Sequence, residues 1–117
     1  MINWIDIVEK TTVESLCFLE NKTPNEIVSE PILKAKLIKM MSEIVRVGHF
    51  INIDFPENFI NQNLKKASII TDKLEFNVTK YINDLDYIIK LGNDKKISIN
   101  QNIQILNMLK QKIEQSK

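Results

Sequence analysis

Glycine and proline are so scarce in this chain that several classes of architecture are excluded. The 117 residues include two glycines, Gly48 and Gly92, and three prolines, Pro24, Pro31 and Pro56. A β-sandwich or barrel needs many turn residues, and collagen-like segments and flexible linkers are rich in glycine. None of these classes fits the sequence. The same scarcity leaves no glycine-rich loop that would hold a phosphate group.

The length of the chain predicts one domain. A single core of this size buries about two-thirds of the surface that the unfolded chain exposes, which leaves too little apolar surface for a second core. A composition of 44% apolar and 26% charged residues is typical of globular proteins. We therefore expect residues 1–117 to form a single helical domain.

Apolar residues recur at the three- and four-residue spacing of amphipathic helices along most of the chain. Residues 3–20 carry one such stripe, residues 31–48 a second and residues 98–117 a third. The stripes consist of Ile5, Val8, Thr12, Leu16 and Leu19, then Leu33, Leu37, Met40, Met41, Ile44 and Val47, and finally Ile99, Ile103, Leu106, Leu109 and Ile113.

Four sites carry the residue pattern of a helix start. A threonine or serine cap followed three residues later by glutamate or glutamine can form a capping box, and proline is favoured in the first helical turn. The sites are Thr11 with Glu14, Thr23 with Pro24 and Glu26, Ser29 with Pro31, and Ser98 with Gln101. The second is the clearest boundary in the chain, and the first indicates a break near residue 11.

The strongest periodicity lies between residues 60 and 88, where apolar residues alternate at four- and three-residue spacing. One helix over residues 56–91 would be about 54 Å long, which exceeds the diameter expected of a compact chain of this size. Either that helix bends or the molecule is elongated, and the β-branched residues Ile69, Ile70 and Thr71 place a kink near residues 69–72. The predicted fold is all-α, an antiparallel helical bundle of four to five helices.

Reactive side chains are too few to assemble the common catalytic or metal sites. His49 is the only histidine and Cys17 the only cysteine. His49 with Asp54 is a candidate general base, but a histidine favoured by the dipole at a helix end is the better interpretation. Cys17 as a nucleophile would need His49 close by, and an inert thiol is the better interpretation. We therefore predict no enzymatic activity, no cofactor and no metal site.

The sequence shows no signal for export or for insertion into a membrane. Asp6 and Glu9 stand where a secretory signal needs positive charge followed by an apolar stretch. The longest uncharged segment, residues 97–109, contains five asparagine and glutamine residues. An unpaired Cys17 fits a reducing compartment. We expect a cytoplasmic protein without membrane contact, and a single arginine with a net charge of +1 argues against nucleic-acid binding.

Charge is divided unevenly along the chain. Residues 1–30 hold six acidic and two basic side chains, a net charge of −4, whereas residues 31–117 hold a net charge of +5. An acidic surface can attract and hold a basic partner, although acids near helix starts are also favoured by the helix dipole. On one continuous helix Asp6, Glu9 and Glu20 would lie within about 60° of each other. The candidate partner-binding residues are Asp6, Glu9, Glu14, Glu20, Glu26 and Glu30.

In size, expected compartment and lack of catalytic motifs, the chain resembles the immunity proteins that protect bacteria from delivered toxins, such as those of contact-dependent growth inhibition systems. The resemblance implies a bundle that binds the toxin domain, often a basic nuclease, and blocks its active site. The alternative is a homodimeric regulatory or structural protein in which residues 60–88 form an intermolecular coiled coil. Because the other amphipathic helices need that apolar surface for their own burial, we expect a monomer.

Overall fold

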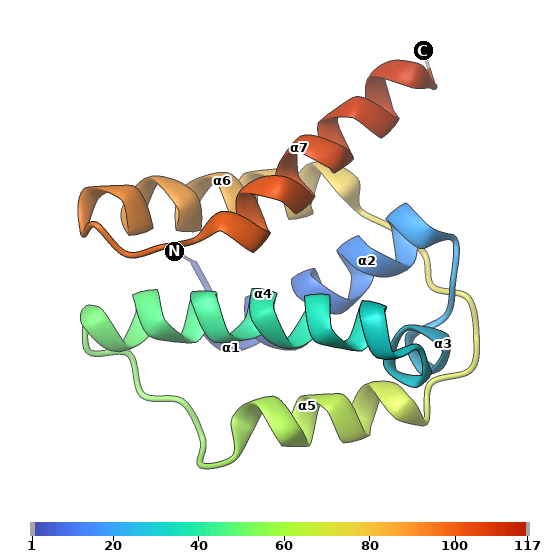
Figure 1. The fold of residues 1–117 in the computed structure, drawn as a ribbon, viewed down its shortest axis with the longest axis horizontal. Helices are drawn as coiled ribbons and strands as arrows, with labels where there is room; N and C mark the ends of the chain where they lie inside the picture. Colours follow the sequence, from blue (N-terminus) through green and yellow to red (C-terminus); the bar gives the residue numbers. More distant parts are fainter. Residues whose placement is uncertain (1, 117) are drawn as a thin grey trace.

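All regular secondary structure in residues 2–116, the part of the chain that the computed structural model describes, is helical (Figure 1). The elements are α1 (Trp4–Asp6), the π-helix η1 (Ile7–Thr11), α2 (Thr12–Glu20), α3 (Pro24–Ser29), α4 (Pro31–Phe50), α5 (Phe59–Ser68), α6 (Val78–Asp94) and α7 (Asn100–Gln115). Because α1, η1 and α2 are continuous, they form one N-terminal helix, and residues 2–116 contain six helices. The predicted all-α bundle is confirmed, with one helix more than expected.

The four helices from α4 to α7 alternate in direction. In Figure 1, α4 and α6 run from right to left, whereas α5 and α7 run back from left to right. The described chain measures 35 × 34 × 26 Å, so the elongated alternative is wrong. None of the helices in residues 2–116 has the length and apolar character needed to cross a membrane.

The N-terminal helix lies at the centre of the bundle, where α2 contacts α3, α4, α6 and α7. Its buried side chains extend well beyond the predicted stripe, as is typical of a helix that neighbours cover on several sides. They are Trp4, Ile7, Val8, Thr11, Thr12, Val13, Ser15, Leu16 and Cys17. The Thr12 hydroxyl donates to the carbonyl of Val8 at 2.8 Å, so this buried polar group is paired.

A π turn interrupts the N-terminal helix. The N–H of Thr12 donates to the carbonyl of Ile7, five residues back, where an α-helix would use the carbonyl four residues back. The helix is distorted here but continues from Trp4 to Glu20, so neither the predicted break near residue 11 nor the predicted capping box is present. Thr11 keeps helical backbone angles, and its hydroxyl donates to Asp84 of α6 at 2.8 Å instead of capping α2.

The remaining predicted caps differ in outcome because some helix ends are closed by distant residues. The capping box of Thr23 and Glu26 is confirmed. At α4 the cap position is Glu30, and the Ser29 hydroxyl donates to the carbonyl of Glu26 instead, so the predicted serine cap is wrong. At α7 the box of Ser98 and Gln101 is also wrong, because the helix begins at Asn100 without a local side-chain cap.

The carboxylate of Glu43, which belongs to α4, closes the start of α7. It accepts the backbone N–H groups of Gln101 and Asn102, each at 3.1 Å, and the Asn102 side-chain amide at 2.9 Å. Glu43 is 5% exposed. A carboxylate at a helix N-terminus satisfies donors that have no partner within the helix and interacts favourably with the helix dipole.

The segment of residues 56–91 forms two helices. α5 ends at Ser68, α6 begins at Val78, and the non-helical connector between them starts where the kink was predicted. Leu64, Ala67 and Leu85, three of the regularly spaced apolar residues, are buried in the chain's own core. The alternative interpretation, one intermolecular coiled-coil helix over residues 60–88, does not fit this geometry, because residues 69–77 are not helical.

Candidate partner-binding surface

The predicted acidic residues lie on the N-terminal helix, on α3 and at the start of α4, and most of them have partners within the chain. We call Asp6, Glu9, Glu14, Glu20, Glu26 and Glu30 the N-terminal acidic surface. Asp6 pairs with Lys10, and Glu9 pairs with Lys66 of α5, each at 3.6 Å. These long, partly exposed pairs contribute at most about 1 kcal/mol each and exchange easily with solvent or another partner.

Asp6 also belongs to a more closely bonded group at the π turn. The Lys80 amino group donates to Asp6 at 3.0 Å, to Asp84 at 2.8 Å and to the Thr11 hydroxyl at 3.2 Å. Burial disfavours the charged amine, but the hydrogen bonds to Asp84 and Asp6 outweigh that effect and raise the pKa of Lys80 above its ordinary value. The group connects η1 to α6, so Asp6 is an internal bridge as well as a surface acid.

Glu14 faces α6 in a similar way. It accepts the Tyr81 hydroxyl at 2.5 Å, and the Tyr81 oxygen accepts the N–H of Asn77 at 3.1 Å. Burial, followed by the hydrogen bond to Glu14, raises the pKa of Tyr81 well above its ordinary value. The hydrogen bond between Tyr81 and Glu14 therefore stabilises the packing of α6 against α2.

The other three acids lie toward the end of α2 and around α3. The hydrogen bonds from the Thr23 backbone and side chain lower the pKa of Glu26. Glu30 pairs with Lys22 at 3.5 Å. The Glu20 side chain makes no hydrogen bond or ion pair with another residue among those described. Binding of a basic partner to Glu20 would therefore not require an existing ion pair or hydrogen bond of its side chain to break.

The π turn also changes how the acids are arranged around the helix. A turn closed over five residues inserts one residue, which rotates everything after it by about 100° relative to an uninterrupted α-helix. Glu20 follows the π turn, whereas Asp6 precedes it and Glu9 lies within it. The expected clustering of these three acids assumed an uninterrupted helix and does not apply.

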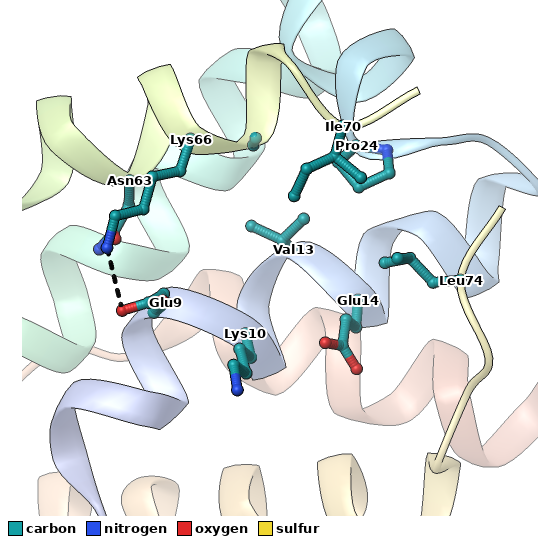
Figure 2. A pocket seen from close by; sticks show the side chains of 10 residues that line it. Glu9, Lys10, Val13, Glu14, Pro24, Asn63, Lys66, Ile70 and Leu74 are labelled. Atoms are coloured by element: carbon teal, nitrogen blue, oxygen red, sulfur yellow. Dashed lines mark ion pairs between the residues drawn. The ribbon is translucent and has the colours of Figure 1, made fainter. Parts of the chain in front are cut away.

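A cavity of about 170 Å³ lies between the N-terminal helix, the start of α3, α5 and the connector after α5 (Figure 2). Figure 2 shows Val13, Pro24, Ile70 and Leu74 facing one another across it, whereas Lys10 and Glu14 point away. The ion pair of Glu9 and Lys66 lies at its edge. The remaining lining residues are Asn63 and Ala67.

Two consecutive apolar residues at the start of the connector after α5 are exposed, and the second of them lines the cavity. Ile69 is 79% exposed, and Ile70, which lines the cavity, is 39% exposed. Neither residue was predicted from the sequence to be functional, and a helix kink was expected at this pair. Asn63 was also missed. Its position between Ile60 and Ala67 of the apolar pattern makes it a polar residue at a core-facing site, which was the available signal.

The two candidate reactive residues, His49 and Cys17, differ in their exposure. His49 is exposed near the end of α4, with its ring edge-on to Phe55 at 5.4 Å between centroids. Cys17 is fully buried, and burial raises the pKa of its thiol to about 12, which favours the unreactive protonated form. Among residues 2–116, no three His, Cys, Asp or Glu side chains are arranged so that they could hold a metal ion.

Comparison with protein-family models, curated proteins and solved structures finds no match to this chain.

Proposed function

We propose that the chain is a cytoplasmic inhibitor of the immunity type, which binds a cognate toxin domain and blocks its active site. The observation that supports the proposal is the arrangement of apolar and charged residues on the surface around Glu9. Exposed Ile70 lines an apolar cavity, the more exposed Ile69 precedes it in the chain, and the Glu9–Lys66 ion pair lies at the edge of the cavity. Protein interfaces have this organisation, with an apolar centre and a polar rim.

A basic partner suits this surface because the ion pairs of its rim are weak. The partner of Glu9 is Lys66, which is 61% exposed and 3.6 Å away, and Glu30 pairs with Lys22 at 3.5 Å. A lysine or arginine from another protein can replace either lysine at little cost, because an exposed pair contributes less than about 1 kcal/mol. Arginine would gain most, since it can bind a carboxylate through two parallel hydrogen bonds.

The proposal predicts a one-to-one complex with the toxin encoded by the neighbouring reading frame, measured by isothermal titration calorimetry. The double variant Glu9→Lys and Glu20→Lys should weaken binding about tenfold or more, because it places positive charge opposite a basic partner. The matched control Glu57→Lys and Asp94→Lys makes the same change in net charge at exposed positions outside the N-terminal acidic surface.

Four results distinguish the parts of this proposal. Weaker binding in the first double variant alone supports the N-terminal acidic surface. Equal weakening in both double variants reduces the acidic surface to a general charge effect, and unchanged affinity in both removes its role. Absence of any complex with the wild-type chain would remove the immunity proposal itself.

A further inference from the structure

Asn63 buries a polar side chain without the hydrogen bonds that such burial normally requires. It lies in the middle of α5 and is 2% exposed, and neither its amide nitrogen nor its amide oxygen has a partner among residues 2–116. Burial of an unpaired amide costs about 1–3 kcal/mol, and asparagine is also a weak helix former. A leucine would avoid both costs at this position, so the amide is suited to a partner from outside the chain.

The cavity beside Asn63 has the size and lining of a site for one ring. Its volume is about 170 Å³, and Val13, Ala67 and Leu74 supply much of its apolar wall. An apolar cavity of about 150 Å³ is known to hold a benzene molecule. Pro24 and Ile70 add further apolar contact from α3 and from the connector after α5 (Figure 2).

The entrance next to Asn63 can open at low cost. Figure 2 shows Lys66 reaching from α5 toward Glu9, with Asn63 beside the pair. The ion pair is 3.6 Å long and the Lys66 side chain is 61% exposed. Rotation of this side chain into solvent would break the ion pair at a cost of less than about 1 kcal/mol. Glu9 lies in the π turn, and such turns occur frequently at functional sites.

We propose that this cavity binds a small uncharged molecule made of one ring that carries a primary or cyclic amide. The Asn63 side chain offers two donors and one acceptor in a plane, which match the N–H and C=O groups of such a ligand. Asparagine recognises the edge of adenine through the same kind of paired hydrogen bonds. A charged ligand is disfavoured, because Glu9 and Lys66 already neutralise each other and the wall is apolar.

This inference goes beyond the proposed function and does not depend on a protein partner. Benzamide and toluene are suitable probes, since they share a ring and differ in the amide, and binding is followed in two-dimensional ¹H–¹⁵N NMR spectra. Benzamide should shift the Asn63 side-chain amide signals and the backbone signals of Val13 and Ala67. In Asn63→Leu the preference for benzamide over toluene should fall about tenfold. Gln62→Leu, at an exposed site on the same helix, should leave that preference unchanged.

The wild-type spectrum decides the proposal even if Asn63→Leu does not fold. If millimolar benzamide leaves the Asn63 side-chain signals unmoved, the cavity is not an amide site. If Asn63→Leu folds and keeps the preference for benzamide, Asn63 is not the recognising group and the proposal is equally wrong. Neither result bears on toxin binding, which calorimetry measures separately with the partner protein.

Discussion

Asparagine occupies backbone positions in this chain that glycine occupies in most proteins. Asn21, Asn52 and Asn58 have φ angles of 54°, 67° and 59°, in the left-handed region that glycine adopts most readily. Asn21 ends α2 and Asn58 precedes α5. The two glycines have negative φ angles, and Gly48 serves a different purpose, since a Cβ there would lie 2.7 Å from the Phe55 ring. The scarcity of glycine thus excluded turn-rich folds without removing the chain's capacity to turn.

Single residues also show which contacts the sequence can predict. The capping box of Thr23 and Glu26 was predictable because both partners lie within one turn. The Glu43 cap of α7 was not, because the carboxylate and the N–H groups that it accepts are 58 and 59 residues apart in the chain. The unpaired state of the Asn63 amide could not be predicted either, because it depends on which residues surround the side chain in the folded chain.

Loss of the Glu43 carboxylate should destabilise the protein markedly. In Glu43→Ala the buried N–H groups of Gln101 and Asn102 lose their acceptor, so the free energy of unfolding should fall by about 2–3 kcal/mol. Urea unfolding at neutral pH measures the change. Glu75→Ala, at an exposed position in the connector after α5, should change stability by less than about 0.5 kcal/mol. A similar loss in the two variants would contradict the assigned role of Glu43.

At the scale of elements, hydrophobic spacing predicted where helices lie better than where they end. The apolar stripe of α4 was predicted in full, and its six residues are buried. The apolar spacing over residues 60–88 suggested one helix. It arises instead from two helices, α5 and α6, whose apolar residues are buried in the same core. The π turn had no comparable signal, since the hydrogen bonds that hold it against α6 come from Lys80 and Asp84, far away in the sequence.

The contact between α2 and α6 should weaken at alkaline pH. The raised pKa of Tyr81 means that the folded state holds the phenol proton more tightly than the unfolded state. This contribution is complete below the unfolded pKa of about 10 and is lost as the pH rises toward the folded pKa. The raised pKa of Lys80 acts in the same direction.

The variant Tyr81→Phe tests this linkage. At neutral pH it should lower the free energy of unfolding by about 1–2 kcal/mol, because the bonds to Glu14 and Asn77 are lost. Between about pH 9 and pH 11 its stability should then fall less steeply than that of the wild type. Tyr87→Phe, at a half-exposed tyrosine of the same helix, should keep the wild-type slope. An unchanged slope in Tyr81→Phe would contradict the assignment.

At the scale of the whole molecule, folding redistributes the charge that the sequence separates. The first thirty residues carry a net charge of −4, but lysines from α5 and α6 lie against their carboxylates, as in the pairs of Glu9 with Lys66 and Asp6 with Lys80. The acidic surface predicted from the sequence is therefore largely paired. The apolar surface at Ile69 and Ile70 was not predicted, because burial depends on the path of the connector.

The most direct test of the proposed function is a titration of toxin activity with the purified chain. The toxin encoded by the neighbouring reading frame is assayed at a concentration well above the dissociation constant of the complex. The proposed mechanism predicts that activity falls linearly with added chain and is abolished at one equivalent, because each bundle blocks one active site. Full toxin activity in the presence of a large excess of folded chain would contradict it.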